Sequence, residues 1–438
     1  MLRSVWSQPS LSADWSGDYD EKSAEWFELF LDLLMVTACS SVAETLKEDL
    51  TLHGLIYFVF LTSAYTVSWT LYTGFHARFN EKSLLHYLFL YVWLVGLGGM
   101  VLAGEPGVTF TIGLILIRAA QLMMYSAVYF LLRRARPQAF IDIVFLSVNL
   151  GILCISLLLP SSWTIPCYVV VLLLEAFGRL IVAERQWFLK PGHSLPANID
   201  HMNERYGCLV MVVLGESIVS IIINFHDPAL LTLRVFFMMH LALLVIFSMA
   251  LFYFTIQPPR EFHAMRRSRY TGIAFGWMHL PLFPSLLAIG VSLKLVTAAV
   301  LADKPLLASH TWWLFSSIAA SMAIMVIIRL LHFGGRHPSS FDPIHIKRIK
   351  YVWWAVICAS PLFPLICAAS LVSASGDSID PIHALVVATA FNVAWILAES
   401  AMMHQLLKLG YGQLSGEEPT ESSQPKETSR LLASQSQE

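Results

Sequence analysis

Residues 83–103 read SLLHYLFLYVWLVGLGGMVLA, an apolar run that contains no Asp, Glu, Lys or Arg. A helix rises about 1.5 Å per residue, so about 20 residues of this kind cross the hydrocarbon of a bilayer. Similar runs recur from residue 26 to residue 407 with only short polar breaks between them. The sequence predicts twelve spans, over 25–45, 52–76, 83–103, 108–132, 140–159, 163–183, 205–225, 230–255, 271–296, 310–332, 350–374 and 382–406. We therefore predict an all-α fold, a polytopic transmembrane helical bundle.

The overall composition agrees with this fold class. Of the 438 residues, 56% are hydrophobic and 13% are charged, whereas an average soluble domain has roughly 45–50% and about 25%. A water-soluble fold could not bury so much apolar side chain, so the lipid bilayer is the expected environment. The formal net charge of −2 gives no support for nucleic acid as a partner.

The sequence gives no sign of a cofactor or a metal site, and none is expected. The six cysteines are scattered, and no two of them form a Cys-x-x-Cys pair. Neither a disulfide framework nor a zinc site is therefore predicted. The chain contains no Gly-x-x-x-x-Gly-Lys-Ser/Thr motif and no His-Glu-x-x-His motif, which disfavours a nucleotide site and a zinc protease.

The distribution of Lys and Arg predicts the orientation. Loops rich in these residues stay on the cytoplasmic side. If the N-terminus is cytoplasmic, most Lys and Arg of the connecting segments fall on that side. The opposite loops then keep only Lys47, Arg234, Lys294 and Lys304. Because the number of predicted spans is even, both termini are expected in the cytoplasm.

The longest polar break divides the chain into two halves. The predicted parts are a cytoplasmic N-terminal segment at 1–24, a first six-helix half at 25–183, a cytoplasmic linker at 184–204, a second six-helix half at 205–407 and a disordered cytoplasmic tail at 408–438. Residues 28–36 and 204–212, which begin the two halves, are identical at four of nine positions. Either the halves arose by duplication, or this short match is chance.

The tail contains a short pattern that suggests a sorting signal. Glu427, followed by Leu431 and Leu432, resembles the acidic dileucine signal that clathrin adaptors read. A clathrin adaptor is therefore a candidate partner, and the expected location is an endosomal, lysosomal, vacuolar or plasma membrane. The alternative is an inert tail.

Several ionisable residues lie inside or at the ends of the predicted spans. A charged side chain at the centre of a spanning helix costs roughly 2.5–3.5 kcal/mol or more, so these residues should face the protein interior. Glu28 and Asp32 lie four residues apart on one helical face, and Glu216 follows Arg205 by eleven residues, about 16 Å deeper. The candidate binding residues are Glu28, Asp32, Arg118, Glu175, Glu204, Arg205, Glu216, His279 and Glu399.

Each of these residues also has a purely structural interpretation. A carboxylate paired with Arg118 could fix helix packing, and His279 could be a hydrogen-bonded packing histidine. A carboxyl group without a cationic partner in a low-dielectric interior can instead hold a proton near neutral pH. That is the chemistry of a proton- or cation-coupled carrier.

Three motifs give the chain a resemblance to the low temperature requirement A family of polytopic membrane proteins. They are Trp26-Phe-Glu28-Leu-Phe30-Leu-Asp32-Leu, His201-Met-Asn-Glu204-Arg205-Tyr206-Gly207 leading to Leu214-Gly215-Glu216-Ser217, and His279-Leu-Pro281-Leu. The chain departs from the family pattern at Leu31, where Phe is usual, and at Cys208, where an aliphatic residue is usual. The resemblance implies a multi-pass helical membrane protein and favours the charged motif positions as site residues. It does not imply a particular reaction.

Three functions from different classes are compatible with these observations. The first is transport of a small solute or ion, with Glu216 and Asp32 as coupling carboxylates and Arg118 or Arg205 as their partner. The second is a membrane-embedded enzyme that uses carboxylates as acid and base on an apolar, lipid-like substrate. The third is a non-catalytic membrane protein of stress tolerance, in which the charges serve only structure. We take transport as the leading hypothesis.

Overall fold

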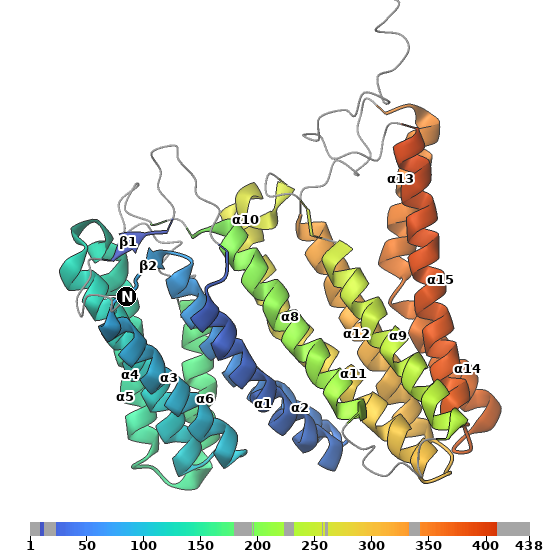
Figure 1. The fold of residues 1–438 in the computed structure, drawn as a ribbon, viewed down its shortest axis with the longest axis horizontal. Helices are drawn as coiled ribbons and strands as arrows, with labels where there is room; N and C mark the ends of the chain where they lie inside the picture. Colours follow the sequence, from blue (N-terminus) through green and yellow to red (C-terminus); the bar gives the residue numbers. More distant parts are fainter. Residues whose placement is uncertain are drawn as a thin grey trace, which may run out of the picture.

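The computed structural model describes residues 9–12, 23–178, 195, 197–222, 232–255, 257–258, 262–332 and 342–409. Long helices lie side by side in this part of the chain and form a tilted bundle (Figure 1). The long helices are α1 (Trp26–Glu48), α2 (Leu52–His76), α3 (Leu84–Ala103), α4 (Val108–Leu131), α5 (Arg136–Ser156), α8 (Ile199–Ile222), α9 (Leu233–Thr255), α11 (Arg269–Leu301), α12 (Ala308–Leu331) and α15 (Pro381–Lys408). Shorter elements are α6 (Thr164–Leu173), the π-helix η3 (Leu174–Gly178), α10 (Ala264–Arg267), α13 (Ile344–Ala359), α14 (Leu362–Ser375) and the 3-10 turns η1 (Arg133–Ala135) and η2 (Ser161–Trp163).

The predicted all-α membrane bundle is confirmed. Large apolar side chains within the long helices, such as Leu33, Phe247 and Leu397, are more than half exposed on the outside of the bundle, where a bilayer would cover them. Within the described residues, 10 helices are long and apolar enough to cross a membrane. Counting the pair α13 and α14 as one bent span raises that number to 11.

The expected count of twelve spans is therefore not confirmed. The difference lies in the predicted span 163–183, where the described residues contain only a shorter apolar helix, Ser161–Phe177. That helix changes from α to π geometry at Leu174. The residues that follow Gly178 lie outside the described part of the chain.

The two Pro-x-x-Pro pairs have different effects on their helices. At Pro361 the span breaks, and α13 and α14 meet at an angle of 49°. Proline lacks the backbone donor that a continuous helix needs, which accounts for the break. Pro281 and Pro284, by contrast, lie inside the continuous helix α11. This helix has the largest buried share of all the candidate spans, so its neighbours hold it on several sides.

Four helices form the centre of the bundle. Helices α1, α2, α8 and α11 pack against one another, and α1 and α8 run in the same direction (Figure 1). Helices α3 to α6 lie on one flank of this core, and α9, α12 and α13 to α15 lie on the other.

The flanking pair α3 and α4 is held by a close contact between two glycines. A Cβ atom on Gly96 would lie 2.6 Å from the carbonyl oxygen of Gly113, and one on Gly113 would lie 2.5 Å from the carbonyl oxygen of Gly96. Small residues allow such backbone contact between membrane helices.

A short antiparallel pairing closes one end of the molecule. Strand β1 (Ser10–Leu11) pairs with β2 (Phe79–Asn80), which follows α2. The backbone N–H of Ser12 also donates to the carbonyl oxygen of Arg78, at 2.8 Å. The segment before α1 is thereby attached to the loop between α2 and α3.

Candidate functional site

The centre of the site is an ion pair between α1 and α8. The Arg205 guanidinium donates to both carboxylate oxygens of Asp32, from Nη1 at 2.6 Å and from Nη2 at 2.8 Å. The Trp69 indole N–H of α2 donates to Asp32 Oδ1 at 2.8 Å, and the guanidinium carbon lies 5.2 Å from the centre of a Trp69 ring. The Arg205 side chain is fully buried and that of Asp32 is 5% exposed. Such a two-pronged pair fixes the register between α1 and α8.

Glu28 lies one helical turn before Asp32 and adds a second carboxylate. Its Oε1 lies 3.1 Å from His201 Nε2 on α8 and 3.9 Å from His76 Nδ1 on α2. Its Oε2 accepts the backbone N–H of Glu25 at 2.9 Å, which caps the start of α1. Glu28 is 1% exposed.

The charges of this cluster do not balance without a proton. If Glu28, Asp32 and Arg205 are all ionised, the buried cluster carries one excess negative charge. An uncompensated buried charge costs several kcal/mol. A proton on Glu28 or on an adjacent imidazole, that of His201 or His76, removes the imbalance.

A group of aromatic side chains connects Trp69, which lies beside Arg205, with α11 through Tyr206. Tyr206 stacks on His279 with ring centres 4.2 Å apart. His279 Nδ1 lies 2.8 Å from the carbonyl oxygen of Phe275, so Nδ1 carries the proton. Nε2 of the neutral ring then accepts the Tyr253 hydroxyl at 2.9 Å. With both nitrogens occupied, His279 has the contacts of a hydrogen-bonded packing histidine.

Glu216 lies deeper along α8 and has different partners. It is 2% exposed and accepts the Ser220 hydroxyl at 2.9 Å. Within the part of the chain that the structure describes, no basic group lies within 4.0 Å of its carboxylate. The nearby Lys294 of α11 pairs instead with Glu44 of α1. Glu216 is thus a buried carboxylate held by a hydroxyl.

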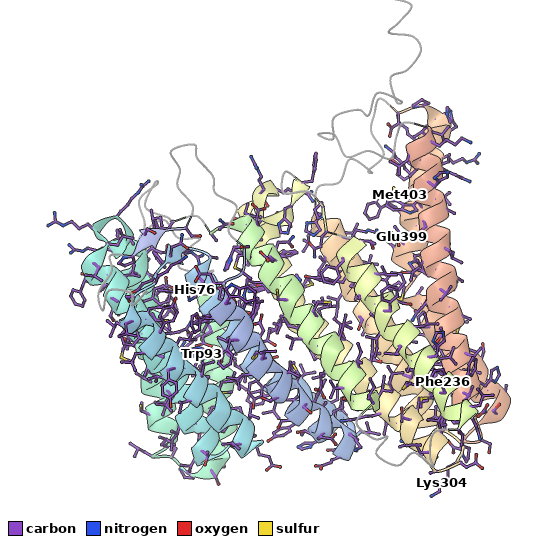
Figure 2. The ribbon with its side chains drawn as sticks, viewed as in Figure 1. His76, Trp93, Phe236, Lys304, Glu399 and Met403 are labelled. Carbon is purple, nitrogen blue, oxygen red and sulfur yellow. The ribbon has the colours of Figure 1, made fainter. Side chains whose placement is uncertain are left out.

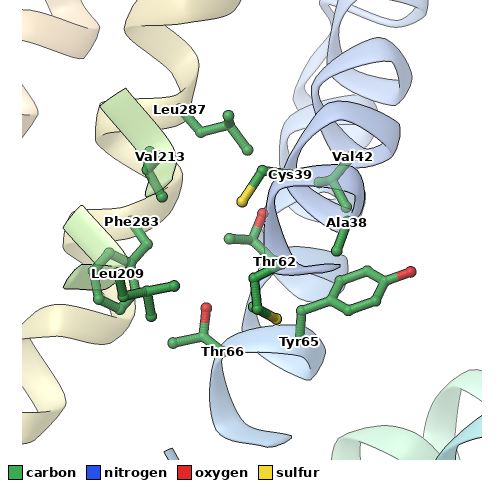
Figure 3. Close-up of a pocket in the computed structure, with 11 residues that line it drawn as sticks. Ala38, Cys39, Val42, Thr62, Tyr65, Thr66, Leu209, Val213, Phe283 and Leu287 are labelled. Atoms are coloured by element: carbon green, nitrogen blue, oxygen red, sulfur yellow. The ribbon is translucent and has the colours of Figure 1, made fainter. Parts of the chain in front are cut away.

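A narrow cavity lies between the Asp32–Arg205 pair and Glu216. Its walls come from α1, α2, α8 and α11, and Figure 3 shows side chains of α8 and α11 facing those of α1 and α2. The lining residues are Met35, Ala38, Cys39, Val42, Thr62, Tyr65, Thr66, Leu209, Val213, Phe283 and Leu287. On α1 they follow Asp32, and on α8 they fall between Arg205 and Glu216. The walls are mainly apolar, and there is room for about one water molecule.

Arg118 belongs to a separate polar cluster. Its guanidinium donates to both oxygens of Glu175 in η3, from Nε at 2.5 Å and from Nη2 at 2.8 Å. Its Nη1 donates to the Ser68 hydroxyl at 2.9 Å, and Asn149 of α5 donates to Glu175 Oε1 at 3.0 Å. All four side chains are buried. Of the two arginines expected as partners of Asp32 and Glu216, Arg205 pairs with Asp32, and Arg118 binds Glu175 instead.

The two remaining candidates, Glu399 and Glu204, do not belong to the buried cluster of Glu28, Asp32 and Arg205. Glu399 of α15 forms an ion pair with Arg329 of α12, beside a second cavity. Figure 2 places Glu399 on the opposite flank of the bundle from His76. Glu204 is exposed, and it accepts the backbone N–H of Ala24 at 3.1 Å. The proposed sorting residues Glu427, Leu431 and Leu432 lie outside the described residues.

Several residues of the cluster are absent from the candidates named from sequence. His201 lies within the second motif, but only its position one turn before Arg205 pointed to it. Trp69 and His76 lie on α2 among many other aromatic residues, so nothing in the sequence marks them. Lys294 was counted among the cations of the outer loops although the predicted span 271–296 contains it, and the structure places it within α11.

The fold and these buried charges define a multi-pass helical membrane protein. Residues 23–406, nearly the whole chain, match the bacterial low temperature requirement A protein (LtrA) family. The protein belongs to this family, as the three motifs indicated. A comparison with curated proteins finds no match.

Proposed function

We propose that this protein is a secondary carrier that moves a small solute or ion and couples that movement to protons or cations. Asp32 and Glu216 would bind the coupling ion, and Arg205 would be the counter-ion of Asp32. The observation that carries the proposal is the position of the cavity between these two carboxylates. The substrate and coupling-ion sites of secondary carriers lie inside the helical bundle, near the bilayer midplane.

The two carboxylates have complementary surroundings. Asp32 is held by a guanidinium and an indole N–H, whereas Glu216 accepts a hydroxyl. Among the described residues no basic group pairs with Glu216, since the nearby Lys294 pairs with Glu44, and a buried carboxylate of this kind favours uptake of a proton or a small cation. The Asp32–Arg205 pair could open to receive a charged group of the solute, because Arg205 attracts an anion and Asp32 a cation.

The cavity walls favour a small solute. They combine apolar side chains with the hydroxyls of Thr62 and Thr66 and the thiol of Cys39. Because there is room for about one water molecule, the helices must separate before a solute enters. We therefore interpret this conformation as a closed one, and transport would require α1 and α2 to move against α8 and α11.

The coupling role can be tested without knowing the solute. Proteoliposomes adsorbed on a solid-supported membrane are exposed to a step in pH, and the displaced charge is recorded. Proton binding by intramembrane carboxylates should produce a transient current. We expect Asp32→Asn and Glu216→Gln each to reduce the displaced charge by about half or more, because each removes one proton-binding group.

A matched control is Glu48→Gln, which alters an exposed carboxylate at the end of α1. This variant should displace as much charge as the wild type. If the wild-type protein displaces no charge in any pH step, or if both core variants match it, then the coupling role of these carboxylates is refuted.

A further inference from the structure

A line of buried ionisable side chains connects the loop between α2 and α3 with the Asp32–Arg205 pair. In order from the loop, its members are Glu81, His86, His76, Glu28 and His201, which we call the histidine array. They come from the loop itself and from α3, α2, α1 and α8.

The spacing along the array is short at every step. Glu81 Oε2 lies 3.7 Å from His86 Nδ1, and the His86 and His76 ring centres are 4.9 Å apart. His76 Nδ1 lies 3.9 Å from Glu28 Oε1, which lies 3.1 Å from His201 Nε2. The two ion-pair steps of 3.7 and 3.9 Å are longer than a hydrogen bond. A proton would cross them after a rotation of the imidazole ring or through one water molecule.

The array is buried along its whole length, and the exposed Lys82 follows Glu81 at its loop end. The side chains of His76, His86, Glu28 and His201 are no more than 5% exposed. Beside the loop end, Glu25 and Lys82 form a half-exposed ion pair at 3.3 Å. Burial raises the pKa of Glu81, which the Ser83 hydroxyl partly offsets by donating to Oε1 at 2.9 Å. Glu81 can therefore hold a proton more readily than an exposed carboxylate.

Other charged and titratable groups face the array from each neighbouring helix. These are Glu25 just before α1, Asp32 on α1, Tyr72 on α2, Tyr87 on α3 and Arg205 on α8. Only Arg205 is a fixed cation among them. It is already engaged by both oxygens of Asp32, and its Nη2 also donates to the backbone carbonyl of Glu28 at 3.3 Å. The Glu28 carboxylate is thus compensated by imidazoles.

We infer that the histidine array is a proton relay that loads the Asp32–Arg205 site from the face of the membrane where α1 begins. Each step breaks one O–H or N–H bond and forms another. An imidazole takes the proton on one ring nitrogen and releases a proton from the other. The excess negative charge of Glu28, Asp32 and Arg205 attracts the proton inward, and Glu28 with His201 passes it on to the Asp32–Arg205 site. This inference rests on the proposed function and names the proton as the coupling ion.

If the relay exists, replacing one of its histidines should slow the displacement current without changing the total charge displaced. In the pH-step experiment, His76→Gln and His86→Gln should slow the displacement current by about tenfold or more, because each removes a proton-transfer group. The total displaced charge should stay near the wild-type value, since Asp32 and Glu216 remain. Added imidazole should restore much of the rate in His76→Ala. The matched control is His53→Gln, at the exposed start of α2, which should leave the rate unchanged.

The rate of the displacement current tests the relay, whereas the total displaced charge tests the coupling role of Asp32 and Glu216. If the wild-type protein displaces charge and both histidine variants keep its rate, the relay is refuted while the coupling role stands. Glutamine retains a polar side chain that can form hydrogen bonds at these sites. If His76→Gln fails to fold, His86→Gln still tests the relay, because His86 lies farther from the Asp32–Arg205 pair.

A second measurement does not depend on transport. After a stopped-flow pH jump in detergent, infrared spectroscopy follows the shifted carboxyl-group band that Glu28→Gln abolishes, whether the proton lies on Glu28 or on the imidazole bound to it. We expect the band to appear more slowly in His76→Gln than in the wild type. If the band appears at the same rate in both proteins, or does not appear at all, the relay is refuted. This result stands whatever the charge-displacement experiment shows.

Discussion

At the scale of single residues, the Asp32–Arg205 pair decides how α1 and α8 fit together. Arg205→Met should lower the free energy of unfolding by about 3–5 kcal/mol, because it leaves Asp32 buried without its cation. Replacing both partners, with Asp32→Leu and Arg205→Met, should recover most of this loss. Unfolding in mixed micelles gives these values for each single variant and for the double variant.

The control for this cycle is Arg234→Met. Arg234 also contacts two carboxylates, those of Asp303 and Asp380, but all three side chains are substantially exposed. Such surface pairs contribute about 0–1 kcal/mol. Equal losses for Arg205→Met and Arg234→Met would show that the buried pair has no special role.

The sequence predicts that these residues face inward, but it does not predict their partners. The high free-energy cost of a charge in hydrocarbon was enough to place Asp32, Arg205 and Glu216 inside the bundle. Which arginine meets which carboxylate depends on the contacts between helices that are far apart in the chain. For this reason Arg118, near the middle of its span, was an equally good candidate partner, and its pairing with Glu175 became clear only from the fold.

At the scale of the helices, hydropathy predicts most boundaries to within a few residues, because a span of about 20 apolar residues is a strong signal. The predicted span 52–76 coincides with α2, and 108–132 differs from α4 by one residue. The bend between α13 and α14 depends on how neighbours support a proline, which hydropathy does not report. The same proline spacing leaves α11 continuous.

The contact between α3 and α4 gives a test at this scale. Gly96→Ala should destabilise the protein by about 1–3 kcal/mol, because the added Cβ meets the backbone oxygen of Gly113 and pushes the helices apart. Gly98→Ala, two residues away, has no atom within 4 Å of its added Cβ. It should be neutral or stabilising, since alanine favours a helix more than glycine does. Thermal unfolding of the two variants in one detergent makes the comparison, and equal melting temperatures would contradict the close contact.

At the scale of the whole molecule, a pair of histidines outside the spanning helices should make the stability depend on pH. His263 precedes α10, and its Nδ1 accepts the backbone N–H of Met265 at 3.3 Å. His332 follows α12, and its Nδ1 accepts the backbone N–H of Ala264 at 3.0 Å. Burial lowers the pKa of His263 from 6.5 to about 4, and burial together with neighbouring histidines lowers that of His332 from 6.5 to about 3.

These shifts set the direction of the effect. Below pH 6.5 the unfolded chain binds protons at both histidines while the folded protein does not, so stability falls as pH decreases toward 4. Each histidine contributes a slope of up to about 1.4 kcal/mol per pH unit. His263→Asn keeps a helix-capping side chain but removes the titration, so its melting temperature should fall less steeply with pH. His383→Asn, at an exposed position on α15, should leave the slope unchanged, and equal slopes for all three proteins would contradict the assignment.

The packing of Ser217 against Gly290 restricts how the molecule can rearrange. A Cβ atom on Gly290 would lie 2.4 Å from the Ser217 hydroxyl oxygen and 3.1 Å from its Cα. Because Ser217 packs directly on the Gly290 backbone, a shift of one helix along the other would meet a steric clash, so we expect α8 and α11 to move together as one unit that carries Glu216. The conformational change would then occur at the interface between α1 and α2 and this unit. The Asp32–Arg205 ion pair crosses that interface and would stabilise the closed conformation.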